Sequence, residues 1–226
     1  MDKTAAMTHI LIADDHPLFR AALTQALREL VPGAKLVEVA TLDAVHDWLD
    51  SNPDTDLVLL DLHMPGSHGL AGLASIRCRH PAVAVAMISA NDDPAVISRA
   101  IDFGAQAFIP KSAAPGEISA ALNAVFACET WVPPALQGRA QIASVRDQDL
   151  SRRLASLTPQ QYRVLELVAQ GQLNKQIADR MGIQERTVKA HLQAIFEKLG
   201  ARNRTQAGVF LRQLELTDPA RQIEVV

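Results

Sequence analysis

Apolar residues in the first half of the chain alternate between short continuous runs and longer stretches with helical spacing. The short runs predict buried strands at residues 10–13, 36–40, 57–60, 83–88 and 107–109. The stretches that follow them predict helices at about residues 17–30, 42–50, 70–79, 94–103 and 115–126. Because each strand is continuously apolar and precedes a helix, we expect an α/β domain with a five-stranded parallel sheet covered by helices on both faces.

From Leu157 onward the apolar pattern is helical throughout. Thr158 and Pro159 form a typical helix start, and Gly171 marks the end of that helix. Further helices are predicted at about residues 174–181, 184–199 and 204–214, and Gly182 provides a tight turn between two of them. This predicts a small all-α, four-helix domain that contains a helix-turn-helix.

The segment between the two halves has a different composition. Trp131, Pro133-Pro134, Gly138 and a polar run at 146–153 predict a surface linker, helical in part from Ile142 onward, that lets the domains move. We therefore divide the chain into a first domain, a linker, a helix-turn-helix domain and a C-terminal tail, at residues 8–128, 129–155, 156–216 and 217–226.

The distribution of charge separates the two domains further. The net charge of the chain is −3, but residues 8–128 hold 14 acidic and 7 basic side chains, whereas residues 156–216 hold 5 acidic and 9 basic ones. The basic second half favours binding to a polyanion. The sequence has no apolar run of about 18 residues and no signal-peptide pattern, and its two cysteines lack metal-type spacing, so we expect a cytoplasmic protein with reduced thiols.

Polar side chains follow four of the five predicted strands, namely Asp14, Asp15, Asp61, Ser89 and Lys111. Ligands of open parallel sheets bind at these carboxyl ends. Carboxylates gathered there would repel one another unless a divalent cation such as Mg²⁺ lay among them. A carboxylate can also attack a phosphoryl group, whose charge the cation, a lysine and a hydroxyl donor would stabilise.

The first domain resembles the receiver domain of two-component response regulators over roughly residues 8–128, and the resemblance implies a flavodoxin-like, doubly wound sheet. The matching strings are A-D-D-H-P at 13–17, L-L-D-L-H-M-P-G at 59–66, I-S-A at 88–90 and G-A-Q-A-F-I-P-K at 104–111. Ala107 stands where many members have Gly, a change expected only to stiffen the backbone.

The resemblance implies a role for each matching residue. Asp61 is the implied phosphoacceptor, and Asp15 and Asp61 are implied direct Mg²⁺ ligands. Asp14 is expected to act through water, and the backbone carbonyl of His63 to complete the ligand set. Ser89 and Lys111 are expected to bind the phosphoryl group, while the rotamer of Phe108 follows Ser89.

Taken singly, these residues have simpler readings. Asp14 and Asp15 fit helix caps, Lys111 fits an exposed lysine, and the side chains of His16 and His63 fit surface or capping positions better than metal ligation. A phosphatase of the haloacid-dehalogenase type would also use an aspartate nucleophile. Such a phosphatase needs a second aspartate as general acid two positions after the nucleophile, and this chain has His63 there. The sequence therefore disfavours the phosphatase interpretation.

The predicted second helix of the helix-turn-helix has an exposed polar face. Lys189, Ala190 and Gln193 lie together on that face and could reach base edges in the major groove. Other residues are better placed to contact phosphates, namely Lys175, Thr187, His191, Arg202 and Arg204.

These residues resemble the LuxR-type helix-turn-helix of the NarL/FixJ family over about residues 156–216. The matching strings are L-T-P-Q-Q-Y-R-V-L-E-L-V-A-Q-G at 157–171, N-K-Q-I-A at 174–178, R-T-V-K-A-H-L at 186–192 and K-L-G-A-R-N-R-T-Q-A at 198–207. The resemblance implies dimerisation through the fourth helix, around Arg204, Ala207 and Leu211. The chain has Gln160-Gln161 where members of the family often have an Arg-Glu pair. Without the resemblance, a plain helical bundle or a protein-interaction module would fit the second half as well.

Together the two resemblances imply a response-regulator transcription factor. A sensor histidine kinase, or a small phosphodonor, would phosphorylate Asp61, and a homodimer would then bind paired half-sites on double-stranded DNA. We expect no membrane partner, no other small-molecule substrate, and no enzymatic activity beyond the domain's own phosphoryl transfer and dephosphorylation. The alternative is a regulator that binds DNA regardless of phosphorylation, with the first domain serving as a docking module.

Overall fold

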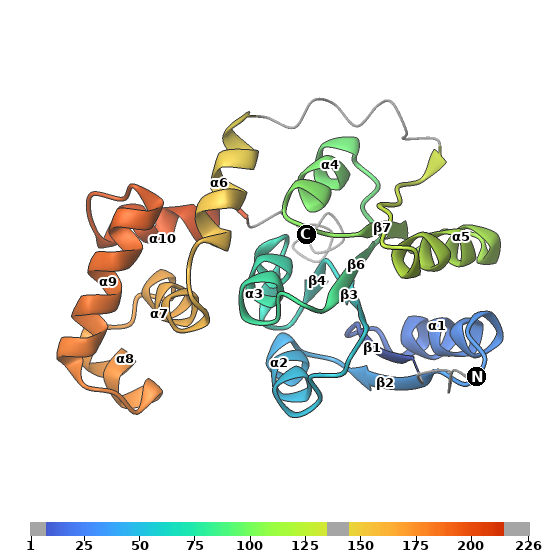
Figure 1. Cartoon of the computed structure of the whole chain (residues 1–226), viewed down its shortest axis with the longest axis horizontal. Helices are drawn as coiled ribbons and strands as arrows, with labels where there is room; N and C mark the ends of the chain where they lie inside the picture. Colours follow the sequence, from blue (N-terminus) through green and yellow to red (C-terminus); the bar gives the residue numbers. More distant parts are fainter. Residues whose placement is uncertain (1–7, 135–144, 215–226) are drawn as a thin grey trace, which may run out of the picture.

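The computed structural model describes residues 8–134 and 145–214, which form an α/β domain and a helical domain (Figure 1). The sheet of the first domain has five strands in the order β2-β1-β3-β6-β7, all parallel. Its strands are β1 (His9–Ala13), β2 (Lys35–Val39), β3 (Leu57–Asp61), β6 (Ala84–Ser89) and β7 (Ala107–Pro110). The predicted doubly wound fold is confirmed. The sequence did not predict the hairpin of β4 (His63–Met64) and β5 (Ser67–His68), whose strands have only two residues each and therefore no readable alternation.

Helices cover both faces of this sheet, because successive strand residues point to opposite sides. Ile10 and Ile12 of β1 pack in the core beneath α1 and α5, whereas Leu11 and Ala13 belong to the core on the other face. The helices are α1 (Pro17–Leu30), α2 (Leu42–Ser51), α3 (Ala71–Arg79), α4 (Pro94–Asp102) and α5 (Pro115–Phe126). Each lies within one or two residues of its predicted range.

The helical domain begins at a well-formed cap. The Thr158 hydroxyl accepts a hydrogen bond from the Gln161 backbone N–H, and the Gln161 side chain accepts one from Thr158 N–H. Gly182 ends the first helix of the helix-turn-helix with φ of 65°, a left-handed conformation that favours glycine. The helices are α7 (Pro159–Ala169), α8 (Asn174–Met181), α9 (Glu185–Leu199) and α10 (Arg204–Arg212).

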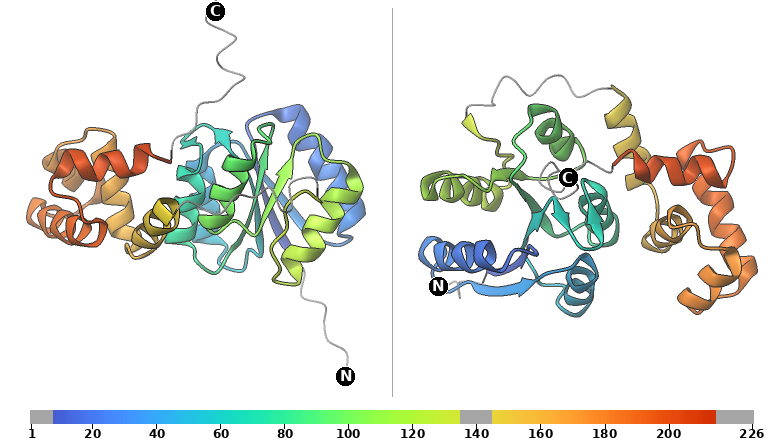
Figure 2. Two further views of the ribbon diagram at one scale, coloured as in Figure 1. Left: turned by 90° about the horizontal axis from the view of Figure 1, so that it is seen from above. Right: turned by 180° about the vertical axis from the view of Figure 1, so that it is seen from behind.

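The predicted linker contains a packed helix, α6 (Val145–Ala155), which lies between the two domains (Figure 2). Leu150 and Leu154, one turn apart, are buried, and the Ser151 hydroxyl donates to the Asp102 carbonyl of the first domain. This half of the segment is therefore part of the interdomain contact and not a surface linker. The helix start predicted near Ile142 lies outside the described residues.

The two domains dock through α3 and the ends of α7 and α10. Tyr162 of α7 is fully buried, and its hydroxyl donates to the Ala71 carbonyl over 3.3 Å. After α10, the Leu214 carbonyl accepts from Leu70 N–H over 2.9 Å, and the side chain of Leu214 is fully buried. The helical domain is thus held against the chain that follows β3.

A chain of hydrogen bonds crosses this interface. The Ser75 hydroxyl donates to Glu166 Oε1 over 3.0 Å. Because its one proton is used there, this hydroxyl accepts from His46 Nε2, at 2.9 Å. The other ring nitrogen of His46, Nδ1, faces His80 Nε2 at 3.2 Å. Burial, followed by the charges of Arg79, His80 and Arg163, lowers the pKa of His46 to about 3. Ser75 is fully buried, so the arrangement joins the domains and is closed to any substrate.

This chain predicts a pH dependence of stability. The pKa of His46 is lower in the folded chain than the ordinary value of 6.5, so stability is full above that value and falls as the pH drops below it. We expect a loss of about 2 kcal/mol between pH 6.5 and pH 5, offset in part by Glu166, whose pKa is raised by burial. Urea unfolding of the wild type and His46→Gln across this range measures it. Equal pH slopes for the two proteins would contradict the assignment.

Candidate phosphoacceptor site and DNA-binding surface

The acidic residues predicted at the strand ends come together at the carboxyl edge of the sheet. Asp14 and Asp61 are buried, with 1% and 3% of their surface exposed, and Asp15 is partly exposed. Lys111, after β7, reaches across to both: its Nζ lies 2.7 Å from Asp14 Oδ2 and 3.2 Å from Asp61 Oδ1. One lysine therefore faces a cluster of three carboxylates.

The electrostatics of this cluster favour a further cation. Burial raises the pKa of Asp61 to about 6, Lys111 acts against this shift, and Asp14 and Asp15 add to it. Asp15 Oδ1 and Asp61 Oδ2 are buried and accept no hydrogen bond from the described residues. Carboxylate oxygens of this kind suit a hard divalent ion, and the chemistry of the site therefore fits Mg²⁺.

The other predicted residues of this site flank the acidic cluster. Ser89, at the end of β6, is buried; its hydroxyl accepts from Asn91 N–H over 2.9 Å, and its carbonyl accepts from Lys111 N–H over 2.7 Å. Phe108 of β7 is fully buried. His63 lies in β4, two residues beyond Asp61, where it pairs with His68 across the hairpin.

His16 is exposed, as expected for a surface residue, and its imidazole lies against the acidic cluster. Its Nδ1 lies 3.1 Å from Asp14 Oδ1 and 3.0 Å from Asp15 Oδ1. His16 is the N-cap residue of α1, yet within the described chain its side chain makes no capping hydrogen bond. The only sequence signal for this position is its place between Asp15 and Pro17.

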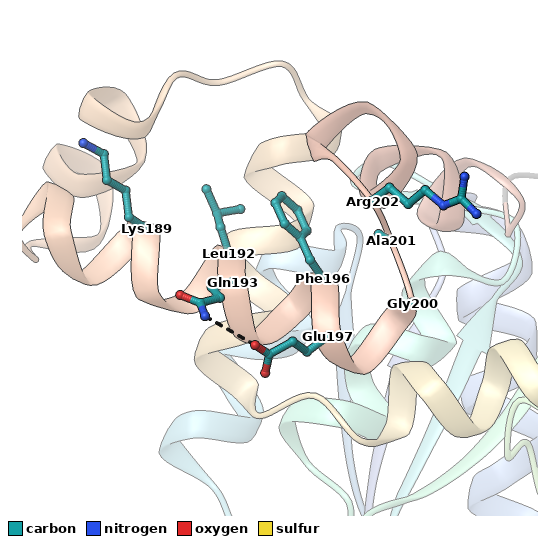
Figure 3. A pocket seen from close by; sticks show the side chains of 8 residues that line it. All are labelled: Lys189, Leu192, Gln193, Phe196, Glu197, Gly200, Ala201 and Arg202. Carbon is teal, nitrogen blue, oxygen red and sulfur yellow. Dashed lines mark hydrogen bonds between the residues drawn. The ribbon is translucent and has the colours of Figure 1, made fainter.

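In the helical domain, α9 presents the residues predicted to read bases. Lys189, Ala190 and Gln193 are exposed, and Thr187 and His191 are partly exposed. Lys189 pairs with Glu185 at 3.3 Å, and the Gln193 amide donates to Glu197 over 3.3 Å. Figure 3 shows Lys189, Gln193 and Glu197 along an open pocket beside α9, which Arg202 also lines.

The predicted contacts of α10 need correction. Ala207 and Leu211 are 0% and 6% exposed, because this face of α10 packs into the domain's own core, so neither side chain is available to a second copy. The exposed residues of α10 include Thr205, Val209 and Arg212.

The basic residues predicted at phosphates divide into two kinds. Lys175 and Arg202 are exposed. Arg204, in contrast, donates to Asn174 Oδ1 over 3.0 Å and to the Gln172 carbonyl, and so connects the starts of α8 and α10.

Comparison with known families decides what these two domains are. Residues 10–123 match the response regulator receiver domain, and residues 155–211 match the bacterial regulatory proteins of the luxR family. The chain belongs to the response regulators. It combines a receiver with a LuxR-type DNA-binding domain and is a transcription regulator, not a metabolic enzyme.

Relatives of this response regulator share its two-domain length. It is 38% identical to the glycerol metabolism activator of Pseudomonas putida, over 93% of this chain and 98% of that protein. It is 32% identical to the nitrate/nitrite response regulator protein NarL of Escherichia coli (strain K12), over 90% of this chain and 94% of NarL.

A solved structure has the same fold. RcsB of Salmonella enterica serovar Typhimurium, bound to a promoter in the presence of the phosphomimetic BeF3⁻, matches this response regulator with a TM-score of 0.52 and 25% identity, over 90% of this chain and 97% of that one. Within residues 8–134 and 145–214 of this response regulator, no helix has the length and apolar character needed to cross a membrane.

Proposed function

We propose that Asp61 accepts a phosphoryl group from a sensor histidine kinase, and that this modification controls dimerisation and sequence-specific DNA binding. The observation that carries the proposal is the Asp61 carboxylate itself. It is buried at the sheet edge, it faces Lys111 at 3.2 Å, and one of its oxygens accepts no hydrogen bond from the described chain. The match to the receiver family supports this assignment.

The residues around Asp61 suit phosphoryl transfer. An Asp61 oxygen attacks phosphorus while the bond from phosphorus to the donor breaks, which leaves an acyl phosphate. Lys111 neutralises charge on the phosphoryl oxygens, and the Ser89 hydroxyl donates to one of them. Mg²⁺ would supply the remaining positive charge. Asp15, Asp61 and the His63 carbonyl would hold the ion, with Asp14 acting nearby.

The signal reaches the helical domain through α4, which precedes β7 and follows Ser89. Arg99 of α4 contacts Asp147 of α6 at 3.3 Å and donates to the Gln213 carbonyl, beyond α10, over 2.7 Å. A shift of Ser89 and Phe108 would move α4 and weaken both contacts. Released helical domains would then pair, through exposed residues of α10 such as Val209, on two half-sites of double-stranded DNA.

Substitution of Lys189 tests the base-reading assignment. Lys189→Ala should weaken binding to a specific site by about 1–3 kcal/mol and leave non-specific binding nearly unchanged, because the side chain is placed to contact a base edge. Lys175→Ala is the matched control; as a phosphate contact it should weaken both kinds of binding alike and reduce the salt dependence. Fluorescence anisotropy with a specific and a scrambled duplex measures both. An equal loss of both affinities in Lys189→Ala would make it a backbone contact.

A further inference from the structure

The imidazole of His16 lies among the carboxylates of the acidic cluster. Its Nδ1 is 3.1 Å from Asp14 Oδ1, 3.0 Å from Asp15 Oδ1 and 3.9 Å from Asp61 Oδ2. These groups offer ligand atoms that all lie within 4.8 Å of one another. The approach is set by the backbone, because His16 N–H donates to Asp14 Oδ1 over 2.7 Å and Pro17 fixes the next residue in the first turn of α1.

His16 Nδ1 faces both kinds of charge at this site. It lies within hydrogen-bonding distance of Asp14 Oδ1, at 3.1 Å, and of Lys111 Nζ, at 3.4 Å. The tautomer of the imidazole decides whether Nδ1 donates to the carboxylate or accepts from the lysine. With the ring proton on Nε2, the Nδ1 lone pair and the carboxylate oxygens would point into the same space, an arrangement that a cation among them would stabilise.

The distances also suit a common metal ion. Neighbouring ligands of an octahedral ion with bonds of about 2.1 Å are separated by about 3.0 Å. Nδ1 has this separation from Oδ1 of the direct ligand Asp15, at 3.0 Å, and this oxygen accepts no hydrogen bond from the described residues. The His16 side chain is 64% exposed, which leaves room for water and an incoming phosphoryl group beside it.

We propose that His16 Nδ1 is a direct metal ligand of the Asp61 site, so that the site binds Mn²⁺, Co²⁺ and Zn²⁺ through a nitrogen that Mg²⁺ does not require. This rests on the metal site of the proposed function. Imidazole nitrogen raises affinity for the later first-row ions, whereas Mg²⁺ prefers oxygen ligands. Loss of the imidazole should therefore change which metals bind, and not only how tightly.

Pulsed electron paramagnetic resonance of the Mn²⁺-loaded full chain tests the ligand directly. The wild type should show the ¹⁴N coupling of a bound imidazole, and His16→Gln should lose it. His63→Gln, which removes the imidazole two residues after Asp61, should retain it. Mn²⁺ bound without nitrogen coupling in the wild type would overturn the assignment and leave His16 as a hydrogen-bond partner of Asp14.

Metal titrations give an independent readout. In His16→Gln the affinities for Co²⁺ and Zn²⁺ should fall by at least about tenfold, while the Mg²⁺ affinity changes by less than about twofold. Asp15→Asn should weaken binding of all three ions. Equal affinities in the wild type and His16→Gln overturn the role of His16 alone. A wild type that binds none of these ions overturns both this assignment and the metal site of the proposed function.

Discussion

Asp61→Asn should abolish phosphoryl uptake and every phosphodonor-dependent change in DNA binding. In the proposed mechanism only the Asp61 carboxylate forms the acyl phosphate, and the neighbouring acids serve the cation. Intact mass after incubation with acetyl phosphate and Mg²⁺ should show one phosphoryl group on the wild type and none on the variant. Anisotropy with a specific duplex should show stimulation for the wild type only.

The stability of the Asp61→Asn variant provides a control for correct folding. The pKa of Asp61 is raised to about 6, so the ionised form of this carboxyl is disfavoured in the folded chain. The protonated carboxyl therefore contributes stability at low pH, and this contribution is lost as the pH rises from about 4 to about 6. Replacing it by Asn should therefore stabilise the metal-free protein at pH 7 by about 1–3 kcal/mol. A stable Asp61→Asn protein that still responds to phosphodonor would contradict the phosphoacceptor assignment. A wild type that gains no phosphoryl group would favour a regulator that binds DNA regardless of phosphorylation.

Phosphorylation should also unmask the thiol of Cys78. In the docked chain Cys78 Sγ donates to the Leu157 carbonyl across the interface over 3.2 Å, and burial, followed by the charge of Glu166, raises its pKa to about 11. Release would return the pKa toward 9 and raise the thiolate fraction at pH 8 by about 100-fold. The alkylation rate of Cys78 in a Cys128→Ser background, measured by mass spectrometry, should rise accordingly when acetyl phosphate and Mg²⁺ are added.

Two variants test whether the alkylation rate of Cys78 reports separation of the two domains. Asp61→Asn in the same background should keep Cys78 slow under all conditions. Tyr162→Phe removes the hydrogen bond from the Tyr162 hydroxyl to the Ala71 carbonyl without changing the charge near Cys78, and should speed alkylation without phosphodonor. Cys128, which is exposed, gives the rate of an open thiol in the unmutated chain. If Cys78 of the wild type is still alkylated slowly after confirmed phosphorylation, Asp61 does not control docking of the two domains.

The sequence predicted the sheet and most helices because their signals are local. Each long strand is a continuous apolar run, and helix starts such as Thr158-Pro159 carry their own capping chemistry. The convergence of Asp14, Asp61 and Lys111 also followed, since parallel strands end at a common edge.

What the sequence did not predict depends on contacts between distant segments. The Ser75–Glu166 hydrogen bond joins residues that are 91 positions apart, and neither residue type suggests the other. In α6, Leu150 and Leu154 lie among charged residues, so their burial depends on docking against the receiver. The inward face of α10 was misassigned, because family resemblance identifies the helix and not the direction of Ala207 or Leu211.

The exposure of α9 in the docked chain has a kinetic consequence. Lys189, Ala190 and Gln193 are open to solvent while the domains are still joined. A single unphosphorylated chain can therefore scan DNA through weak, salt-dependent contacts before any signal arrives. In the proposed mechanism, the delay between signal and response would then be set by how fast two chains pair on DNA, and not by how long each takes to search for its site.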